Sequence, residues 1–398
     1  MSVSEVIDST QIIDVDTHVT EPPDVWTSRM SAAKWGDKIP HVRWDERWHE
    51  ERWHVGDVSF IGVGTGAMAG WGEYVPSQPP TMDDTDPGSW DPIARLKRMD
   101  EYGIYGQLVY PNILGFHWHA FLALNDRALM LECVKAYNDF LADFCSADSR
   151  RLYPLMVLPF WDVDACLEEM DRSAARGHRG IVFAQNFEKV GEPPLSSGHW
   201  DQIFDKAQGM QLPVNFHVGF GAWGSVDDFE HTLAKTSTFD RRTHARDFAL
   251  FMIGNARGIA EVIMNGVCEK FPRLDFVSIE SGFGFIPYFL QALDWQWYND
   301  GIAKDNPGVP LPSEMFKRQV YGTFWFEDIV PEHIAPWVDN VMFETDYPHP
   351  TSLSPGPASS SLRPADMAKK SLAGLPDESV RKIVHGNAAR VYHLNETR

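Results

Sequence analysis

Residue types that bind divalent metal ions stand at the ends of several apolar segments in this sequence. The first segment ends in Asp16-Thr17-His18, and on a strand the side chains of Asp16 and His18 point to the same face. Three further apolar runs end in His217, Glu280 and Asp346. A buried lone charge is costly unless it is paired or coordinated, so we predict that these five side chains meet and hold a divalent metal. The alternative is a set of residues satisfied by hydrogen bonds and helix N-termini.

The segments that carry these residues alternate with helical patterns. We predict strands over Ile12–Asp16, Tyr105–Tyr110, Leu152–Pro159, Gly180–Ala184, Leu212–His217, Leu274–Glu280, Tyr321–Phe326 and Asn340–Asp346. We predict helices over Pro92–Tyr102, Phe121–Cys145, Asp162–Arg176, Trp200–Met210, Thr243–Lys270, Gly284–Asp300, Pro364–Leu372 and Glu378–Tyr392. Most strand segments are continuously apolar, which is typical of strands covered on both faces. This alternation predicts an α/β fold, a parallel (β/α)₈ TIM barrel, with its active site at the C-terminal ends of the strands.

Two long segments interrupt this alternation. Residues 20–91, rich in Trp, Pro and charge, follow the first strand, so we predict a lid at the C-terminal face within a single domain of residues 1–398. The alternative is an insertion that helps the chain to dimerise. A second loop, Val218–Arg242, leaves the fifth strand on the same face and carries Phe220, Trp223 and Phe229. Together the two segments predict an apolar pocket that partly excludes water.

Composition narrows the classes of partner. The 56 acidic residues exceed the 35 basic ones and give a formal net charge of −21, which disfavours nucleic acids and anionic lipid surfaces. No apolar run reaches membrane-spanning length, the N-terminus lacks the pattern of a signal peptide, and the four cysteines form no CxxC pair. We therefore expect a soluble cytoplasmic protein that acts on a small molecule, with no membrane partner.

Longer motifs around the same residues resemble the amidohydrolase superfamily. The resemblance is to the branch that contains aminocarboxymuconate semialdehyde decarboxylase and related aromatic-acid decarboxylases and hydrolases. The motifs span the chain: IDVDTHVTEPPDVW, DPIARLKRMDEYGIYGQLVYPN, LPVNFHVG, NGVCEKFPRLDFVSIESGFGFIPYFL, VMFETDYPHP and KIVHGNAARVYHL. The resemblance implies that Asp16 and His18 correspond to the HxH pair of the family, His217 to its strand-five histidine ligand and Asp346 to its strand-eight aspartate. It also implies a homodimer.

The chain departs from the family pattern at two positions. Asp16 replaces the first histidine of HxH, and Glu280 replaces a strand-six histidine that is often catalytic in the family. The fourth predicted strand offers no lysine or glutamate to bridge two metals, which favours one ion. Two ions remain open if Glu280 is itself a ligand. The ligand types suit Zn²⁺ first, and Mn²⁺ or Fe²⁺ as alternatives.

The ligand set predicts a metal-dependent hydrolase that attacks an acyl bond (amide, ester, thioester or C–C) of a hydrophobic, ring-bearing molecule. Asp346 would orient the attacking water. Glu280 would serve as ligand, general base or proton shuttle, and His349 would protonate the leaving group or, alternatively, brace the turn between two prolines. The first alternative reaction is non-oxidative decarboxylation of an aromatic or unsaturated acid, with Glu280 protonated. The alternative from another class is a metal-free binding barrel.

Several other polar residues receive structural roles. We expect His117 and His119 to line the pocket, and Glu21 to hydrogen-bond a ligand histidine. We expect Arg95 and Arg98, one turn apart, to lie on a solvated helix face.

Overall fold

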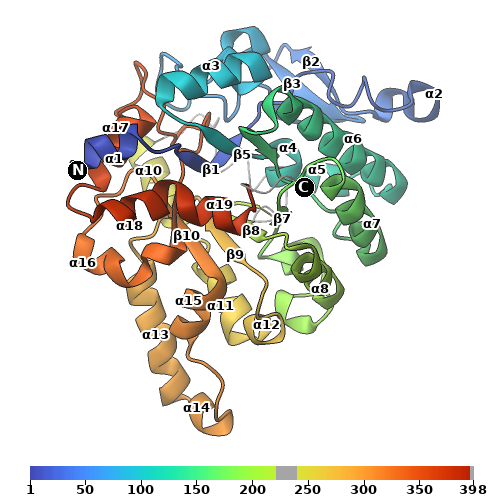
Figure 1. Cartoon of the computed structure of the whole chain (residues 1–398). Helices are drawn as coiled ribbons and strands as arrows, with labels where there is room; N and C mark the ends of the chain where they lie inside the picture. The colour runs from blue at the N-terminus through green and yellow to red at the C-terminus, as the bar shows by residue number, and fades with distance from the viewer. Residues whose placement is uncertain (221–239, 395–398) are drawn as a thin grey trace.

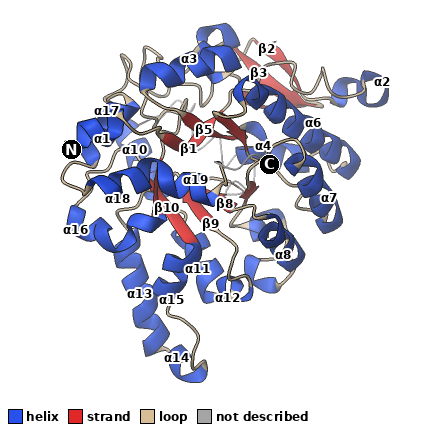
Figure 2. Cartoon of the chain, viewed as in Figure 1, coloured by secondary structure: helices blue, strands red, loops and turns tan. Residues whose placement is uncertain are grey.

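Parallel strands form the centre of the molecule, and helices surround them (Figure 2). The computed structural model describes residues 1–220 and 240–394 of the chain. Within these residues one sheet has the order β1-β5-β6 and a second has the order β11-β10-β9-β8-β7, with every pairing parallel. The strands are β1 (Ile13–His18), β5 (Gly106–Tyr110), β6 (Leu152–Pro154), β7 (Ile181–Phe183), β8 (Val214–His217), β9 (Phe276–Ile279), β10 (Val320–Phe324) and β11 (Val341–Phe343). The predicted α/β class with parallel strands is confirmed.

Isolated bridges connect the two sheets at both of their edges. Thr17 at the end of β1 forms a parallel bridge with Tyr347, which follows β11, and the backbone N–H of His18 donates to the carbonyl of Tyr347 at 2.6 Å. On the other side, Met156 after β6 forms a parallel bridge with Ile181 of β7. The two parallel sheets are therefore joined at both of their edges by single parallel bridges.

Helices follow the strands much as predicted. The longer ones are α3 (Pro92–Tyr102), α6 (Arg127–Cys145), α7 (Val163–Ala174), α8 (Asp201–Met210), α10 (Arg241–Phe251), α11 (Ala256–Met264), α13 (Ile286–Asn299), α15 (Pro312–Gln319) and α17 (Pro364–Ser371). The shorter ones are α1 (Val3–Asp8), α2 (Ala32–Trp35), α4 (Ile113–Phe116), α5 (Trp118–Leu122), α12 (Val267–Lys270), α14 (Ile302–Asp305), α16 (Pro331–Ile334), α18 (Asp377–Arg381) and α19 (Asn387–Val391). The single helix predicted over Thr243–Lys270 is wrong. That segment is divided into α10, α11 and α12 around Gly254 and the left-handed Gly266 (φ 79°). Among the described residues, no helix is both long and apolar enough to cross a bilayer.

Residues 20–91 contain a small antiparallel sheet of their own. It consists of β2 (His41–Asp45), β3 (Glu50–Val55) and β4 (Val58–Gly62), with β3 in the middle. Later in the segment, the backbone N–H groups of Met68 and Ala69 both donate to the carbonyl of Pro348. The segment therefore lies against the chain that follows β11, and its role as a lid stays a prediction.

The C-terminal helices cover one end of the strands. In Figure 1, α18 and α19 cross in front of the central strands. The side-chain amide of Asn387 in α19 donates to the carbonyl of Val341, the first residue of β11, so this end is the N-terminal one. Between the strands, the hydroxyls of Tyr110 and Tyr392 both donate to Oδ1 of Asn215, at 3.1 and 2.6 Å. This end of the strands is thereby closed by packed side chains, and chemistry is left to the opposite end.

Arg95 is fully buried, so its predicted place on a solvated helix face is wrong. Its long side chain reaches from α3 to the edge where β1 meets the segment after β11. The guanidinium donates to the carbonyls of His18 and Gly88, each at 2.5 Å, and its carbon lies 4.6 Å from the ring centre of Tyr347. Further donations go to the Ser89 carbonyl and to Oε1 of Gln107. All of these acceptors are neutral, so Arg95 fixes the backbone at the end of β1 with one buried cation.

Glu21 does not contact a ligand histidine, and that prediction is also wrong. Its Oε1 accepts hydrogen bonds from the backbone N–H groups of Asn112 (3.2 Å) and Ile113 (2.6 Å) and from the hydroxyl of Tyr137. The carboxylate therefore holds the loop after β5 against α6. Burial raises the pKa of Glu21 from 4.5 to about 7, against the opposing effect of these hydrogen bonds.

Replacing Arg95 by Gln is expected to lower the free energy of unfolding by about 3 kcal/mol, because buried carbonyl groups lose their donors. The measurement is urea denaturation of the purified protein. Arg98→Gln is the matched control: Arg98 lies one turn along α3 and forms partly exposed ion pairs with Asp86 and Glu101, whose loss costs about 1 kcal/mol at most. Equal losses in the two variants would contradict the bracing role of Arg95.

A pH-dependent loss of stability is expected from Glu21. Because its folded pKa of about 7 exceeds the ordinary 4.5, its contribution is complete below the lower value and is lost as the pH rises through the higher one. Glu21→Gln removes this titration, so between about pH 4.5 and 8 the variant should gain about 3 kcal/mol relative to wild type. Denaturant titrations at both pH values measure this change. A difference between variant and wild type that does not vary with pH would contradict the raised pKa.

Candidate metal centre

The C-terminal ends of β1, β8, β9 and β11 bring the predicted site residues together. Asp16, His18, His217 and Asp346 have no exposed surface, and Glu280 is 5% exposed. Nε2 of His18 lies 3.0 Å from Nε2 of His217, and Oδ1 of Asp16 lies 3.3 and 3.4 Å from these two nitrogens. Oδ1 of Asp346 is 3.8 Å from Nε2 of His18. The predicted proximity of these side chains is therefore present.

Three overlapping groups of these residues have the geometry to share an ion. In each group, one ligand atom per residue lies within 4.8 Å of the others. The groups are Asp16–His18–His217, His18–Asp346–His349 and Asp16–Glu280–Asp346. The overlap makes Asp16, His18 and Asp346 common to more than one group.

The hydrogen bonding of the centre fits a metal ligand set. Both oxygens of Asp16 are buried, and neither accepts a hydrogen bond from a described residue. The Nδ1 of His217 lies 2.7 Å from the carbonyl of Val218. Donation to that carbonyl leaves Nε2 without a proton, so that its lone pair faces Asp16 and His18. A buried carboxylate between two imidazole nitrogens, with no donor of its own, is the environment that a bound cation would complete.

The charges of the centre act strongly on one another. Burial alone would raise the pKa of Asp16, but the imidazoles of His217 and His18, in their protonated forms, outweigh burial and hold that pKa well below its usual range. Burial, with the neighbouring His349, lowers the pKa of His18 well below the ordinary value. Burial, Asp346 and Asp16 together raise the pKa of Glu280 well above the ordinary value. The protein alone therefore leaves this group of carboxylates short of positive charge.

His349 belongs to the same centre. Its Nδ1 is 2.7 Å from Oδ1 of Asp346, and its ring is stacked on that of His18 with centroids 3.9 Å apart. On the other side, its Nε2 lies 3.3 Å from Oδ1 of Asn112. The hydroxyl of Thr351 donates to Oδ2 of Asp346 at 2.5 Å. His349 thus stands between the buried carboxylates and the space outside them.

Two further buried acids, Glu344 and Asp14, hold the backbone at the strand ends that carry Glu280 and Asp346. Glu280 and Asp346 both have left-handed backbones, with φ of 54° and 58°. The carboxylate of Glu344 accepts a hydrogen bond from the N–H of Glu280 at 3.1 Å, and that of Asp14 accepts from the N–H of Thr345 at 2.9 Å. Glu344 interrupts an apolar run in the way that Glu280 ends one, so the same pattern in the sequence could identify it.

An inner cavity of about 130 Å³ adjoins the centre. Glu280 and His349 are in its wall, together with the predicted pocket residue His117 and the rings of Phe116 and Phe251. The ring of Phe116 packs 5.1 Å from that of His217 and 5.5 Å from that of His18. His119, predicted to line the pocket too, is buried and packs against His117. Of the predicted aromatic loop, Phe220 is buried beside His217, while Trp223 and Phe229 lie outside the described residues.

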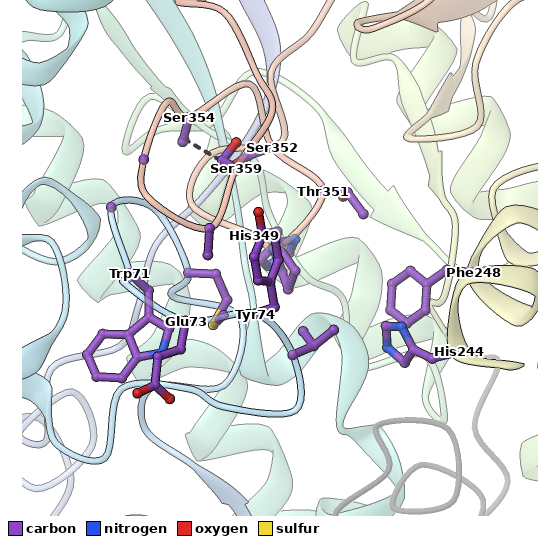
Figure 3. Close-up of a pocket in the computed structure, with 16 residues that line it drawn as sticks. Trp71, Glu73, Tyr74, His244, Phe248, His349, Thr351, Ser352, Ser354 and Ser359 are labelled. Atoms are coloured by element: carbon purple, nitrogen blue, oxygen red, sulfur yellow. Dashed lines mark hydrogen bonds between the residues drawn. The ribbon is translucent and has the colours of Figure 1, made fainter. Parts of the chain in front are cut away.

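A second, outer cavity of about 220 Å³ lies beside the inner one and is shown in Figure 3. The two cavities share His349, Pro350 and Thr351 in their walls. The pocket that the sequence predicts is therefore present as two neighbouring spaces, of which the inner one borders Glu280.

The sequence and the structure of this chain are both similar to those of known proteins. A family model described as amidohydrolase matches residues 13–394. The gamma-resorcylate decarboxylase of Rhizobium sp. (strain MTP-10005) is 24% identical over 274 residues, which cover 64% of this chain and 76% of that protein. An amidohydrolase from Mycobacterium avium subsp. paratuberculosis K-10 has a similar structure, with a TM-score of 0.70 and 22% identity over 96% of this chain and 99% of its own.

A third similar structure is that of a dihydroxybenzoic acid decarboxylase from Polaromonas sp. JS666, which contains manganese and the inhibitor 2-nitroresorcinol. It has a TM-score of 0.58 and 16% identity, and the match covers 98% of each chain. Because the family model covers nearly the whole sequence, the chain belongs to the amidohydrolase family.

Proposed function

We propose that this protein is a metal-dependent decarboxylase that removes the carboxyl group of an aromatic acid without oxidation. The observation that carries the proposal is the position of Glu280, which belongs to the buried carboxylate cluster and also lines the inner cavity. A single acid can therefore face both the metal centre and a bound ring. The decarboxylases from Rhizobium and Polaromonas support this reaction over the hydrolysis that the sequence analysis puts first.

We assign one divalent ion to Asp16, His18, His217 and Asp346. The buried oxygens of Asp16, which accept no hydrogen bond from a described residue, support this assignment. Zinc is the first choice for two imidazoles with carboxylates, and manganese, present in the Polaromonas structure, is the main alternative, with Fe²⁺ also compatible. When bound by these residues, such an ion would supply Lewis acidity toward the oxygen atoms of the substrate.

The residues of the chain perform the proton transfer. Protonated Glu280 donates its proton to the ring carbon that bears the carboxylate. The bond between that carbon and the carboxylate then breaks, CO₂ leaves, and the electron pair of the bond restores the aromatic ring. His349 is held by Asp346 through Nδ1, so that Nε2, which contacts Asn112 when no substrate is bound, can turn its hydrogen bond to a substrate oxygen. Phe116 in the cavity wall excludes water from the reacting carbon.

Hydrolysis of an acyl compound is the second candidate function. The observation in its favour is the pair of Asp346 and His349, 2.7 Å apart, which could deprotonate a water and then protonate a leaving group. A metal-free binding barrel is the third candidate. It would be supported if the purified protein bound no metal, and it would be wrong if the protein bound one.

Three structural expectations accompany the proposed function. We propose that the eight strands form a closed (β/α)₈ barrel, supported by the bridges at Thr17–Tyr347 and Met156–Ile181 and by the similarity to the Mycobacterium structure. We also propose that part of residues 20–91 acts as a lid, since Met68 and Val75 line the inner cavity. The homodimer and the cytoplasmic location stay predictions, and light scattering tests the first.

Metal analysis of the purified protein should give about one divalent ion per chain. Removal of that ion by a chelator should lower the melting temperature, and re-addition should restore it, because an ion that binds only the folded state stabilises it. The double variant His18→Ala, His217→Ala should lose the ion. The matched control, His117→Ala with His119→Ala, should keep the ion. If instead the ion persisted in the first double variant and was lost in the second, His117 and His119 would be the ligands, and the assignment to His18 and His217 would be wrong.

Decarboxylation should be detectable as CO₂ release from a panel of hydroxybenzoates that includes gamma-resorcylate. Glu280→Gln should lower kcat about 10²- to 10⁴-fold, the usual contribution of a general acid, while the metal content stays unchanged. Glu327→Gln is the control, because Glu327 is partly buried, accepts hydrogen bonds from Phe283 and Gly284, and does not line the inner cavity. Release of an acid or amine from esters or amides, without CO₂ release from any benzoate, would favour hydrolysis instead.

A further inference from the structure

The inner cavity has room for one aromatic ring. Its volume is about 130 Å³, and an apolar cavity of about 150 Å³ binds benzene in another protein. A benzoate bound beside Glu280 would therefore fill it. The outer cavity adds about 220 Å³ that a single-ring acid does not use.

The outer cavity has walls of a different chemistry. Figure 3 shows Trp71 and Glu73 on one side, Ser352, Ser354 and Ser359 on another, and His349 between them. The hydroxyl of Ser352 donates to that of Ser354 at 2.9 Å. Hydroxyl groups both donate and accept hydrogen bonds, so a neutral polar group finds partners of either kind on this wall.

Two aromatic residues, Trp71 and Tyr74, line the outer cavity, and a hydrogen bond orients the first of them. The indole N–H of Trp71 donates to the hydroxyl of Ser77 at 3.1 Å, which orients its ring. Tyr74, which also lines the cavity, is 58% exposed and offers both a ring and a hydroxyl. The carboxylate of the exposed Glu73, in the wall of this cavity, disfavours a second anionic group beside it.

We propose that the outer cavity is a second substrate subsite and that the natural substrate is a single-ring acid with a neutral, hydroxyl-bearing side group. The ring and its carboxylate would occupy the inner cavity. The side group would pass His349 and lie between Trp71 and the serines. This inference rests on the proposed function, because it takes the acid end of the substrate to be bound beside Glu280.

Binding of three probes to the zinc-loaded protein, measured by calorimetry, tests the inference. The probes are 2-hydroxybenzoate, its 4-(2,3-dihydroxypropoxy) derivative and its 4-(carboxymethoxy) derivative. The diol derivative should bind about ten-fold more tightly than 2-hydroxybenzoate, which corresponds to one or two additional hydrogen bonds. The carboxymethoxy derivative should show no such gain, and Glu73→Gln should increase its affinity.

Ala358→Phe provides the variant that fills the outer cavity. Ala358 lines the outer cavity and not the inner one. The variant should lose the gain from the diol while it binds 2-hydroxybenzoate as wild type does, which also shows that it is folded.

The outcomes separate the two proposals. If 2-hydroxybenzoate binds and the diol brings no gain, or if the gain survives in Ala358→Phe, the second subsite is wrong and the proposed function is unaffected. If none of the three acids binds to the metal-loaded protein, the proposed function and the subsite both fail.

Discussion

Repulsion between buried carboxylates is the constraint on which this structure depends. Asp16, Glu280, Glu344 and Asp346 are buried at the C-terminal ends of the strands, and Asp14 is buried within β1. In a medium of low polarisability such charges cannot all persist without protons or cations nearby. Protonation of some of them, the imidazoles of the centre and a bound divalent ion are complementary answers to the same problem. Burial of these carboxylates therefore lowers the stability of the fold, but it supplies the site with the charged groups that catalysis needs.

Hydrogen bonds around the centre hold the backbone of the ligand residues rigidly in position. Glu280 and Asp346 have left-handed backbones, and hydrogen bonds to Glu344 and Asp14 hold the adjacent N–H groups. Behind β1, Arg95 binds the carbonyl groups of Gly88 and His18. Polar contacts of this kind are directional, so they fix the positions of the ligand atoms more closely than apolar packing could.

Much of the centre was predictable because parallel strands end at a common edge. Asp16 and His18 lie near the end of the first apolar run, and His217 and Asp346 each end another run, so strand order then brings them together. The roles of Arg95 and Glu21 were not predictable, since a long side chain on a helix or loop can turn toward solvent or toward the core. The chain around it decides. The outer cavity was equally hidden, because Trp71 and Ser354 lie in segments without a helical or strand period and meet only through the fold.

The edge where β1 meets the segment after β11 has a consequence for biosynthesis. Asp14 and Thr345, hydrogen-bonded across this edge, are 331 positions apart in the sequence. At synthesis rates of about 5 to 20 residues per second, β1 waits roughly 20 to 60 seconds for its partner to leave the ribosome. During that time one side of β1, with Asp16 and His18, is an unpaired strand edge open to wrong pairing. The ion can be captured with its full set of ligands only afterwards, so metal uptake is among the last events in the maturation of this protein.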